Sequence, residues 1–163
     1  MKRSTNGFTM IELVFVILIG SILTGVALSS FRNVQARFAV RGAKEVYMTW
    51  HQRARAKAIE SGETVIMVVW VSGDSTALLS QVNGAFQFSD VQRFDELGVQ
   101  LRTQGNFSFI MCMTPRGYAD RNCGQLGSLY GYQQTFGDTI RLQFWLNADS
   151  ASVLILPMGQ LVG

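Results

Sequence analysis

The sequence predicts an α+β protein in which one long N-terminal helix packs on a C-terminal antiparallel β-sheet or small β-sandwich. Three observations predict this class. An apolar run from Phe8 to Leu28 leads into a segment with helical periodicity, and no proline interrupts the chain before Pro115. After Gly62 the pattern changes to short β-branched segments separated by Gly, Asn and Asp. Short strands at such close spacing favour an antiparallel sheet over a βαβ fold.

The apolar run is long enough to cross a bilayer as a helix, since it contains about 21 residues. Its only ionisable side chain is Glu12. A carboxylate in hydrocarbon must either be neutral or meet a cation. The nearest bases, Lys2 and Arg3 before the run and Arg32 after it, lie outside the apolar segment. Glu12 therefore needs a partner that the run does not supply.

The segment from Gly7 to Leu13, Gly-Phe-Thr-Met-Ile-Glu-Leu, follows a short basic leader without acids. It resembles the class III signal of type IV pilins and type II secretion pseudopilins. The resemblance implies that a prepilin peptidase cuts between Gly7 and Phe8 on the cytoplasmic side and methylates the new amino terminus of Phe8. It also implies that this cationic amine pairs with Glu12 of a neighbouring subunit during assembly. The cation missing beside Glu12 is then a terminus that processing creates.

Two alternatives share the basic start and the apolar core. One is an ordinary cleaved secretory signal, for which 26–29 is an acceptable cleavage region. The other is a plain membrane anchor that tolerates an acid. Neither alternative accounts for Gly7, Phe8 and Glu12 together. The basic leader itself predicts a cytoplasmic N-terminus.

Length and composition leave room for one globular domain after the membrane run, because the chain has 163 residues. Charged residues make up 15% of it, against about 25% in a typical soluble protein. This low value suits a subunit packed among neighbours. The net charge of +3 does not by itself indicate a nucleic-acid partner. The expected divisions are a leader at 1–7, a transmembrane and filament-core helix at 8–28, an amphipathic helix at 29–61 and a β-rich pilin body at 62–163.

Apolar residues recur at threes and fours beyond the membrane run, which predicts an amphipathic helix lying on the folded body. They are Phe31, Val34, Phe38, Ala43, Val46, Tyr47, Trp50, Ala54 and Ala58. Ser61 and Gly62 mark the expected end, because glycine allows a left-handed cap. His51 is expected to be a rim or partly buried residue next to the apolar face rather than a catalytic one. Gly20 and Gly25 are the only candidates for the local helix loosening that the resemblance implies during assembly.

The same helical segment is basic on its other side and carries half of the 14 Lys and Arg residues. They are Arg32, Arg37, Arg41, Lys44, Arg53, Arg55 and Lys57. Arg37, Arg41 and Lys44 share one face. Four interpretations are open: a solvated face, contact with anionic lipid headgroups, salt links to neighbouring subunits, and contact with DNA.

Seven segments have strand-like composition: 64–71, 77–82, 85–88, 99–102, 107–113, 139–146 and 152–156. Asn83 and Gly84 form a strong hairpin signal between the second and third of these. The stretch from Gly117 to Gly137 is rich in Gly and Tyr and is expected to be a surface loop.

The two cysteines, Cys112 and Cys123, are expected to form a disulfide if the body lies beyond the inner membrane, where the compartment is oxidising. Closing a loop of about a dozen residues would stabilise the body by about 3 kcal/mol. Two free buried thiols are the alternative. We expect no metal site and no cofactor, because His51 is the only histidine and no further cysteine completes a ligand set.

In the stretch from Arg53 to Val65, Ala alternates with basic residues, and the expected helix ends in Gly62 before the first strand. With 114–118 and 156–159, two strand-Pro-Gly turns, it resembles the H-type pseudopilins and FimT-like minor pilins. The resemblance implies a minor pilin of a type IV pilus, or alternatively a minor pseudopilin of a type II secretion system. The implied partners are prepilin peptidase, other pilins or pseudopilins and the inner membrane. The implied location is a single pass with a periplasmic body, followed by a pilus or a periplasmic pseudopilus.

The sequence lacks the patterns of common catalytic sites, including a Gly-x-Ser-x-Gly elbow and a phosphate-binding Gly loop before a helix. We therefore expect a substrate of a processing enzyme rather than an enzyme. DNA uptake is a third hypothesis, because some FimT-like pilins bind DNA through a Gly-Arg-x-Arg element near the C-terminus. The matching place here, 158–163, has no Arg or Lys, which weakens phosphate contact. The remaining candidate DNA contacts are Arg37, Arg41, Lys44, Arg116 and Arg121.

Overall fold

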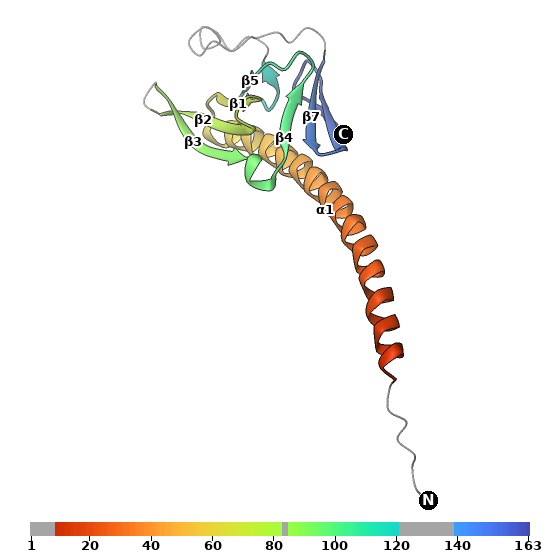
Figure 1. The fold of residues 1–163 in the computed structure, drawn as a ribbon. Coiled ribbons are helices and arrows are strands. Elements are labelled where there is room, and N and C mark those ends of the chain that lie inside the picture. Colours follow the sequence, from red (N-terminus) through yellow and green to blue (C-terminus); the bar gives the residue numbers. More distant parts are fainter. Residues whose placement is uncertain (1–8, 83–84, 121–138) are drawn as a thin grey trace, which may run out of the picture. The chain divides into compact units, whose positions relative to one another are not determined.

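A computed structural model describes residues 9–82, 85–120 and 139–163 of the chain (Figure 1). A long helix, α1 (Met10–Ser61), is followed by two antiparallel β-sheets. This arrangement confirms the predicted α+β class and the order of helix before sheets. The chain divides into two compact units, Met1–Gln35 and Ala36–Gly163. Each unit is described by itself below.

Helix α1 begins directly after Thr9, whose side-chain oxygen accepts a hydrogen bond from the backbone N–H of Glu12 at 3.4 Å. A Thr at the N-cap followed by Glu three residues later is the spacing of a capping box. The helix continues without a break past Gly20 and Gly25. It ends where Gly62 adopts a φ of 68°, the left-handed cap that the sequence predicts.

The first sheet has the strand order β3-β2-β1-β5-β6 and the second has the order β4-β7-β8-β9, with all neighbours antiparallel. In the first sheet the strands are β1 (Val65–Trp70), β2 (Ser75–Val82), β3 (Ala85–Arg93), β5 (Phe109–Met113) and β6 (Ala119–Asp120). In the second they are β4 (Gln100–Thr103), β7 (Ile140–Leu146), β8 (Asp149–Ile155) and β9 (Leu161–Val162). A short 3-10 helix, η1 (Asp95–Leu97), lies between β3 and β4.

All seven predicted strands are present, although their ends shift. The third extends to Arg93, well past the predicted 85–88, because its pairing with β2 continues as far as Ser75. Strands β6 and β9 were not predicted, since each has two residues and is too short for an alternating pattern. The predicted turn at 83–84 lies outside the described residues, as does most of the Gly- and Tyr-rich stretch.

The core of the second unit forms between one face of α1 and the facing sides of both sheets. The helix contributes Val40, Ala43, Tyr47, Trp50, Ala54 and Ala58. On β1, alternate residues Val65, Met67 and Val69 face this helix, as the two-residue period of a strand requires. Ile66 and Val68 face the other way and join a second buried cluster. The first sheet is therefore buried on both faces around β1.

The prediction that Phe38 lies on the body is wrong, because its side chain is 70% exposed within the second unit. Phe31 and Val34 belong to the first unit, in which their side chains are 60% and 46% exposed. The buried stripe begins at Ala36 and continues through Val40. Phe38 is two residues from each of them, which places it about 200° around the helix from the core. The spacing of apolar residues alone does not show that the buried face of α1 differs from the face that carries Phe38.

Candidate functional site

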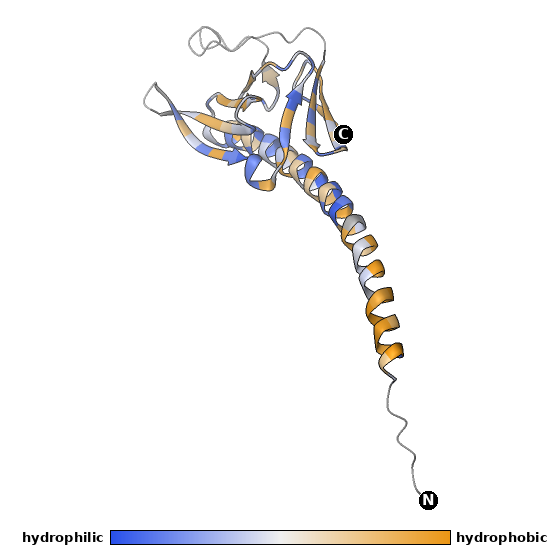
Figure 2. Ribbon diagram, viewed as in Figure 1, coloured by the Kyte–Doolittle hydropathy of each residue, from blue (hydrophilic) through white to orange (hydrophobic). Residues whose placement is uncertain are grey.

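The N-terminal part of α1 exposes apolar side chains on every side. From Ile11 to Leu28 the large apolar side chains are between 52% and 65% exposed. Figure 2 shows this stretch as almost continuously hydrophobic, whereas further along the helix hydrophilic and hydrophobic residues alternate. Among the described residues, α1 is the one helix long and apolar enough to cross a membrane. So large an exposed apolar surface requires lipid or protein neighbours.

The hydroxyl groups within this apolar stretch are satisfied inside the helix. The hydroxyl groups of Ser21 and Thr24 donate hydrogen bonds to the carbonyl oxygens of Leu18 and Gly20, each at 2.7 Å. Internal hydrogen bonds of this kind are what a segment needs in hydrocarbon, because lipid offers no partner. The polar side chains of Ser21 and Thr24 therefore fit a membrane or a filament core.

Glu12 differs from these hydroxyls. Its backbone N–H donates a hydrogen bond to the side-chain oxygen of Thr9. Its carboxylate has no hydrogen-bond or ion-pair partner within the described part of the chain. Its place in the first turn of α1 is favourable for a negative charge, because unpaired N–H groups gather at a helix N-terminus. The helix start thus tolerates the acid but does not neutralise it.

The comparison with protein families agrees with this geometry. A family model for the prokaryotic N-terminal methylation motif matches residues 2–28. The chain carries a prepilin-type methylation motif. This motif supports a type IV pilin-like or pseudopilin protein, and it implies processing by a prepilin peptidase and assembly with other pilins. Gly7 and Phe8 lie within the match but outside the described residues.

No curated protein and no solved structure matches the chain. The resemblance of the Gly7–Leu13 segment to prepilin signals is confirmed at the level of the motif. The assignment of the body to the H-type and FimT-like family stays a prediction, because the match ends at residue 28.

Two of the basic residues on α1 form ion pairs within the second unit. Arg37 meets Asp149 of β8 and Arg53 meets Asp90 of β3, each at 3.2 Å. Both arginines are exposed, so each pair stabilises the fold by at most about 1 kcal/mol. Their effect is mainly positional, because one pair ties α1 to the second sheet and the other ties it to the first. The basic face is thus partly engaged by the body itself.

The candidate DNA contacts fall into separate groups: Arg37 and Arg41 line one pocket beside Asp149, and Arg116 does not belong to it. Arg37 is paired with Asp149, and Lys44 is half-buried against Gly163. The turn that contains Arg116 packs near Arg55. A Cβ atom added to the next residue, Gly117, would lie 3.3 Å from the Nε of Arg55. Arg41 and Arg55 are about 20 Å apart along the helix axis.

The remaining predicted sites concern Arg121 and the cysteines. Arg121 and Cys123 lie outside the described residues. Cys112 is buried in β5, at 2% exposure. The disulfide between Cys112 and Cys123 therefore stays a prediction.

His51 is fully buried, at 4% exposure, rather than at the rim or partly buried as predicted. Burial lowers the pKa of His51 to about 4. A backbone hydrogen bond with Gly159 raises this pKa in part, whereas the positive charge of Arg55 lowers it further. Its Nε2 and the hydroxyl of Tyr47, one turn earlier, have no hydrogen-bond partner among the described residues. Burial also raises the pKa of the Tyr47 hydroxyl well above its usual range. The pattern of apolar residues could not reveal this polar pair inside the core.

We expect the body to lose stability as the pH falls below about 6.5. The folded state holds His51 neutral down to a pKa of about 4, whereas the unfolded chain takes up a proton near 6.5. Lowering the pH from 7.5 to 5 should therefore reduce the free energy of unfolding by about 2 kcal/mol. Urea unfolding of the full chain in mild detergent, followed by tryptophan fluorescence, measures this change.

His51→Gln is the matched variant, because His51 is the chain's only histidine. The variant should show a much smaller loss of stability over the same pH range, even if it is less stable at pH 7.5. An equal pH dependence in both proteins would contradict the assignment to His51.

Proposed function

We propose that this protein is a minor pilin, a structural subunit that is processed by prepilin peptidase and assembled into a type IV pilus. The observation that carries the proposal is the exposed apolar helix from Ile11 to Leu28, with one unpaired acid, inside a matched methylation motif. Before assembly this helix would hold the protein in the inner membrane, with the N-terminus cytoplasmic and the body periplasmic. In the filament it would pack against the same helix of other subunits.

The role is structural rather than catalytic. Among the described residues, no three His, Cys, Asp or Glu side chains gather as a metal site would require. The buried His51 has no acid or nucleophile among the partners described for it, which are the backbone of Gly159 and the charge of Arg55. Both features support a subunit whose chemistry is performed on it by the processing enzyme.

A type II secretion pseudopilin would use the same helix and the same processing. The two functions differ in where the filament ends, so shear release of surface filaments distinguishes them. A pilus subunit is recovered in the sheared fraction, whereas a pseudopilus subunit stays with the cell. DNA capture is less well supported, since Arg37 is paired with Asp149 and Arg116 lies outside the pocket that Arg37 and Arg41 line.

Processing at Gly7 provides the direct test. We expect the mature protein to begin at Phe8 and to carry a methyl group on its amine, as measured by intact-protein mass spectrometry. Gly7→Leu should leave the leader attached, because the peptidase would meet a side chain at the cut. Gly25→Leu makes the same change inside the matched segment and should be processed normally. A mature N-terminus at any other residue would refute the proposed function.

A further inference from the structure

The outward face of the second sheet, away from α1, is mostly polar and basic along β4 and β7, whereas its far edge carries the apolar Leu154 and Val162. The strand register places Gln100 beside Trp145 and Ser150 in one row, and Arg102 beside Gln143 and Ser152 in the next. Arg141 follows two residues along β7, on the same face. The side chains of these rows include two arginines and no acid. We call this set, Gln100, Arg102, Arg141, Gln143, Trp145 and Ser152, the outer face.

Arg102 is held in place without being neutralised. Its guanidinium lies over the Trp145 ring, 4.8 Å from the ring centroid. It has no ion pair among the described residues. Stacking on an aromatic ring orders the planar group and leaves its N–H donors at the edge free. The group is therefore prepared for an anion, because less side-chain entropy is lost on binding.

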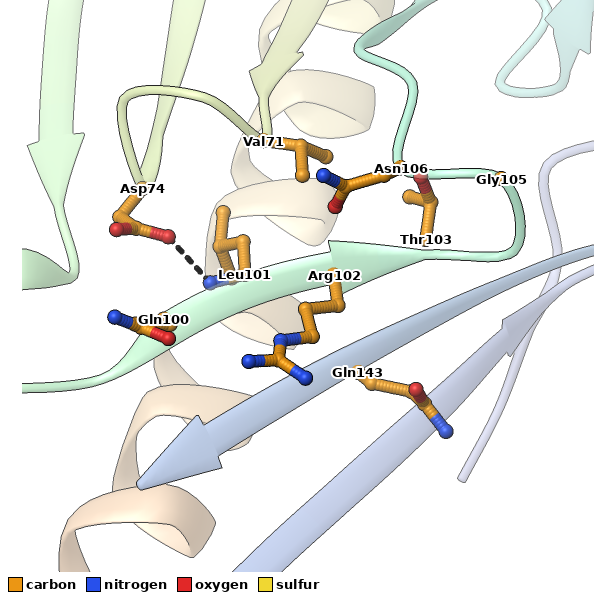
Figure 3. A pocket seen from close by; sticks show the side chains of 9 residues that line it. All are labelled: Val71, Asp74, Gln100, Leu101, Arg102, Thr103, Gly105, Asn106 and Gln143. Atoms are coloured by element: carbon orange, nitrogen blue, oxygen red, sulfur yellow. Dashed lines mark hydrogen bonds between the residues drawn. The ribbon is translucent and has the colours of Figure 1, made fainter. Parts of the chain in front are cut away.

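A polar pocket of about 510 Å³ adjoins this face (Figure 3). Its lining includes Gln100, Arg102 and Gln143 from the outer face, together with Asp74 and Asn106. One oxygen of Asp74 accepts the backbone N–H of Leu101. The side-chain amides of Gln100, Asn106 and Gln143 have no partner within the described part of the chain. The pocket thus offers several free donors and acceptors around one cation.

The combination of one cation with several amide groups around the pocket favours one class of ligand. A run of phosphates would also meet the carboxylate of Asp74, which lines the same pocket as Arg102 and disfavours dense negative charge. A sugar chain with one carboxylate on some of its units needs one cation and many amide or hydroxyl partners for its hydroxyl groups.

We propose that the outer face and its pocket bind an acidic polysaccharide, with Arg102 pairing with a sugar carboxylate and the neighbouring amides binding hydroxyl groups. The proposal concerns the body and goes beyond the filament role of the helix. The binding proposal and the proposed function can therefore fail independently. Binding is measured on the purified protein, whereas processing is measured by intact-protein mass spectrometry.

The test uses the full chain in mild detergent and three probes of similar length: oligogalacturonate, neutral dextran and oligothymidylate. Tryptophan fluorescence and calorimetry report binding. We expect oligogalacturonate to bind, dextran and oligothymidylate to bind at least about tenfold more weakly, and Arg102→Gln to weaken oligogalacturonate binding at least about tenfold. Arg102→Lys keeps the charge but loses the planar fork and should be intermediate.

Arg41→Gln is the matched control, since Arg41 is exposed on α1 and lies outside the outer face. Its affinity for oligogalacturonate should stay within about twofold of the unchanged protein. Equal binding of oligogalacturonate and dextran, or unchanged affinity in Arg102→Gln, would overturn the proposal. Tighter, Arg102-dependent binding of oligothymidylate would overturn the choice of a sugar and assign the surface to nucleic acid.

Discussion

Replacing Glu12 by valine is expected to prevent the protein from entering filaments while leaving it in the membrane. The carboxylate has no partner among the described residues, and it lies in the part of α1 whose large apolar side chains are exposed, from Ile11 to Leu28. In a packed filament such a carboxylate must meet a cation, and the processed amine of Phe8 in a neighbouring subunit is the one that the motif implies. Removing one partner leaves the other charge buried and unpaired.

The size of the effect follows from that unpaired charge. Breaking a buried ion pair costs about 3–5 kcal/mol, or more than about a hundredfold in incorporation. Loss of the capping position at the helix start would cost only about 1 kcal/mol. Membrane insertion should be unchanged or improved, because valine is more apolar than a carboxylate. The amount of protein in sheared filaments and in membranes, measured by immunoblot, gives both values.

Two further variants test whether the loss of incorporation is caused by the missing charge of Glu12. Glu12→Gln keeps the size but removes the charge and should fail to assemble like the valine variant. Thr24→Val removes a hydroxyl whose hydrogen bond is internal to the helix, at Gly20, and should assemble normally. Normal incorporation of Glu12→Gln would show that no charge pair operates at this position.

Replacing Gly159 by alanine is expected to destabilise the body by about 3 kcal/mol. Gly159 has a φ of 73°, a conformation that costs an L residue about 1 kcal/mol or more. A Cβ built there would fall 2.2 Å from the Cβ of Ala119 and 3.3 Å from its backbone. Overpacking of this kind costs about 1–3 kcal/mol. The neighbour cannot rotate away, because Ala119 donates its backbone N–H to the carbonyl of Met158 at 3.1 Å.

Gly42→Ala is the control for this substitution. Gly42 lies within α1, and a Cβ there would meet nothing within 4 Å. The same change should stabilise the protein by up to about 1 kcal/mol, because alanine is the better helix former. Urea unfolding of the full chain in mild detergent measures both. A Gly159→Ala protein as stable as the unchanged one would mean that β6 and the 156–159 turn do not pack as described.

Much of the fold could be predicted because the signals are local. The strand at 64–71 was recognisable from its β-branched residues, and it appears as β1. The helix end at Gly62 was recognisable from a residue that favours a left-handed cap. Phe38 could not be placed, because spacing at threes and fours does not tell which face of a helix meets the body. The core position of His51 was also missed, since only contacts with distant residues such as Gly159 bury it.

The sequence by itself determined the helix, the positions of the longer strands and the motif around Gly7, Phe8 and Glu12, because each depends on residues close together in the chain. Tertiary structure alone decided that Arg37 and Arg53 pair with acids on two different sheets. It also decided that Arg102 lies over Trp145, which is 43 positions further along the chain, and that Gly159 faces Ala119. The physical reason is that strand register and sheet order, which no short stretch of sequence specifies, bring these distant residues into contact.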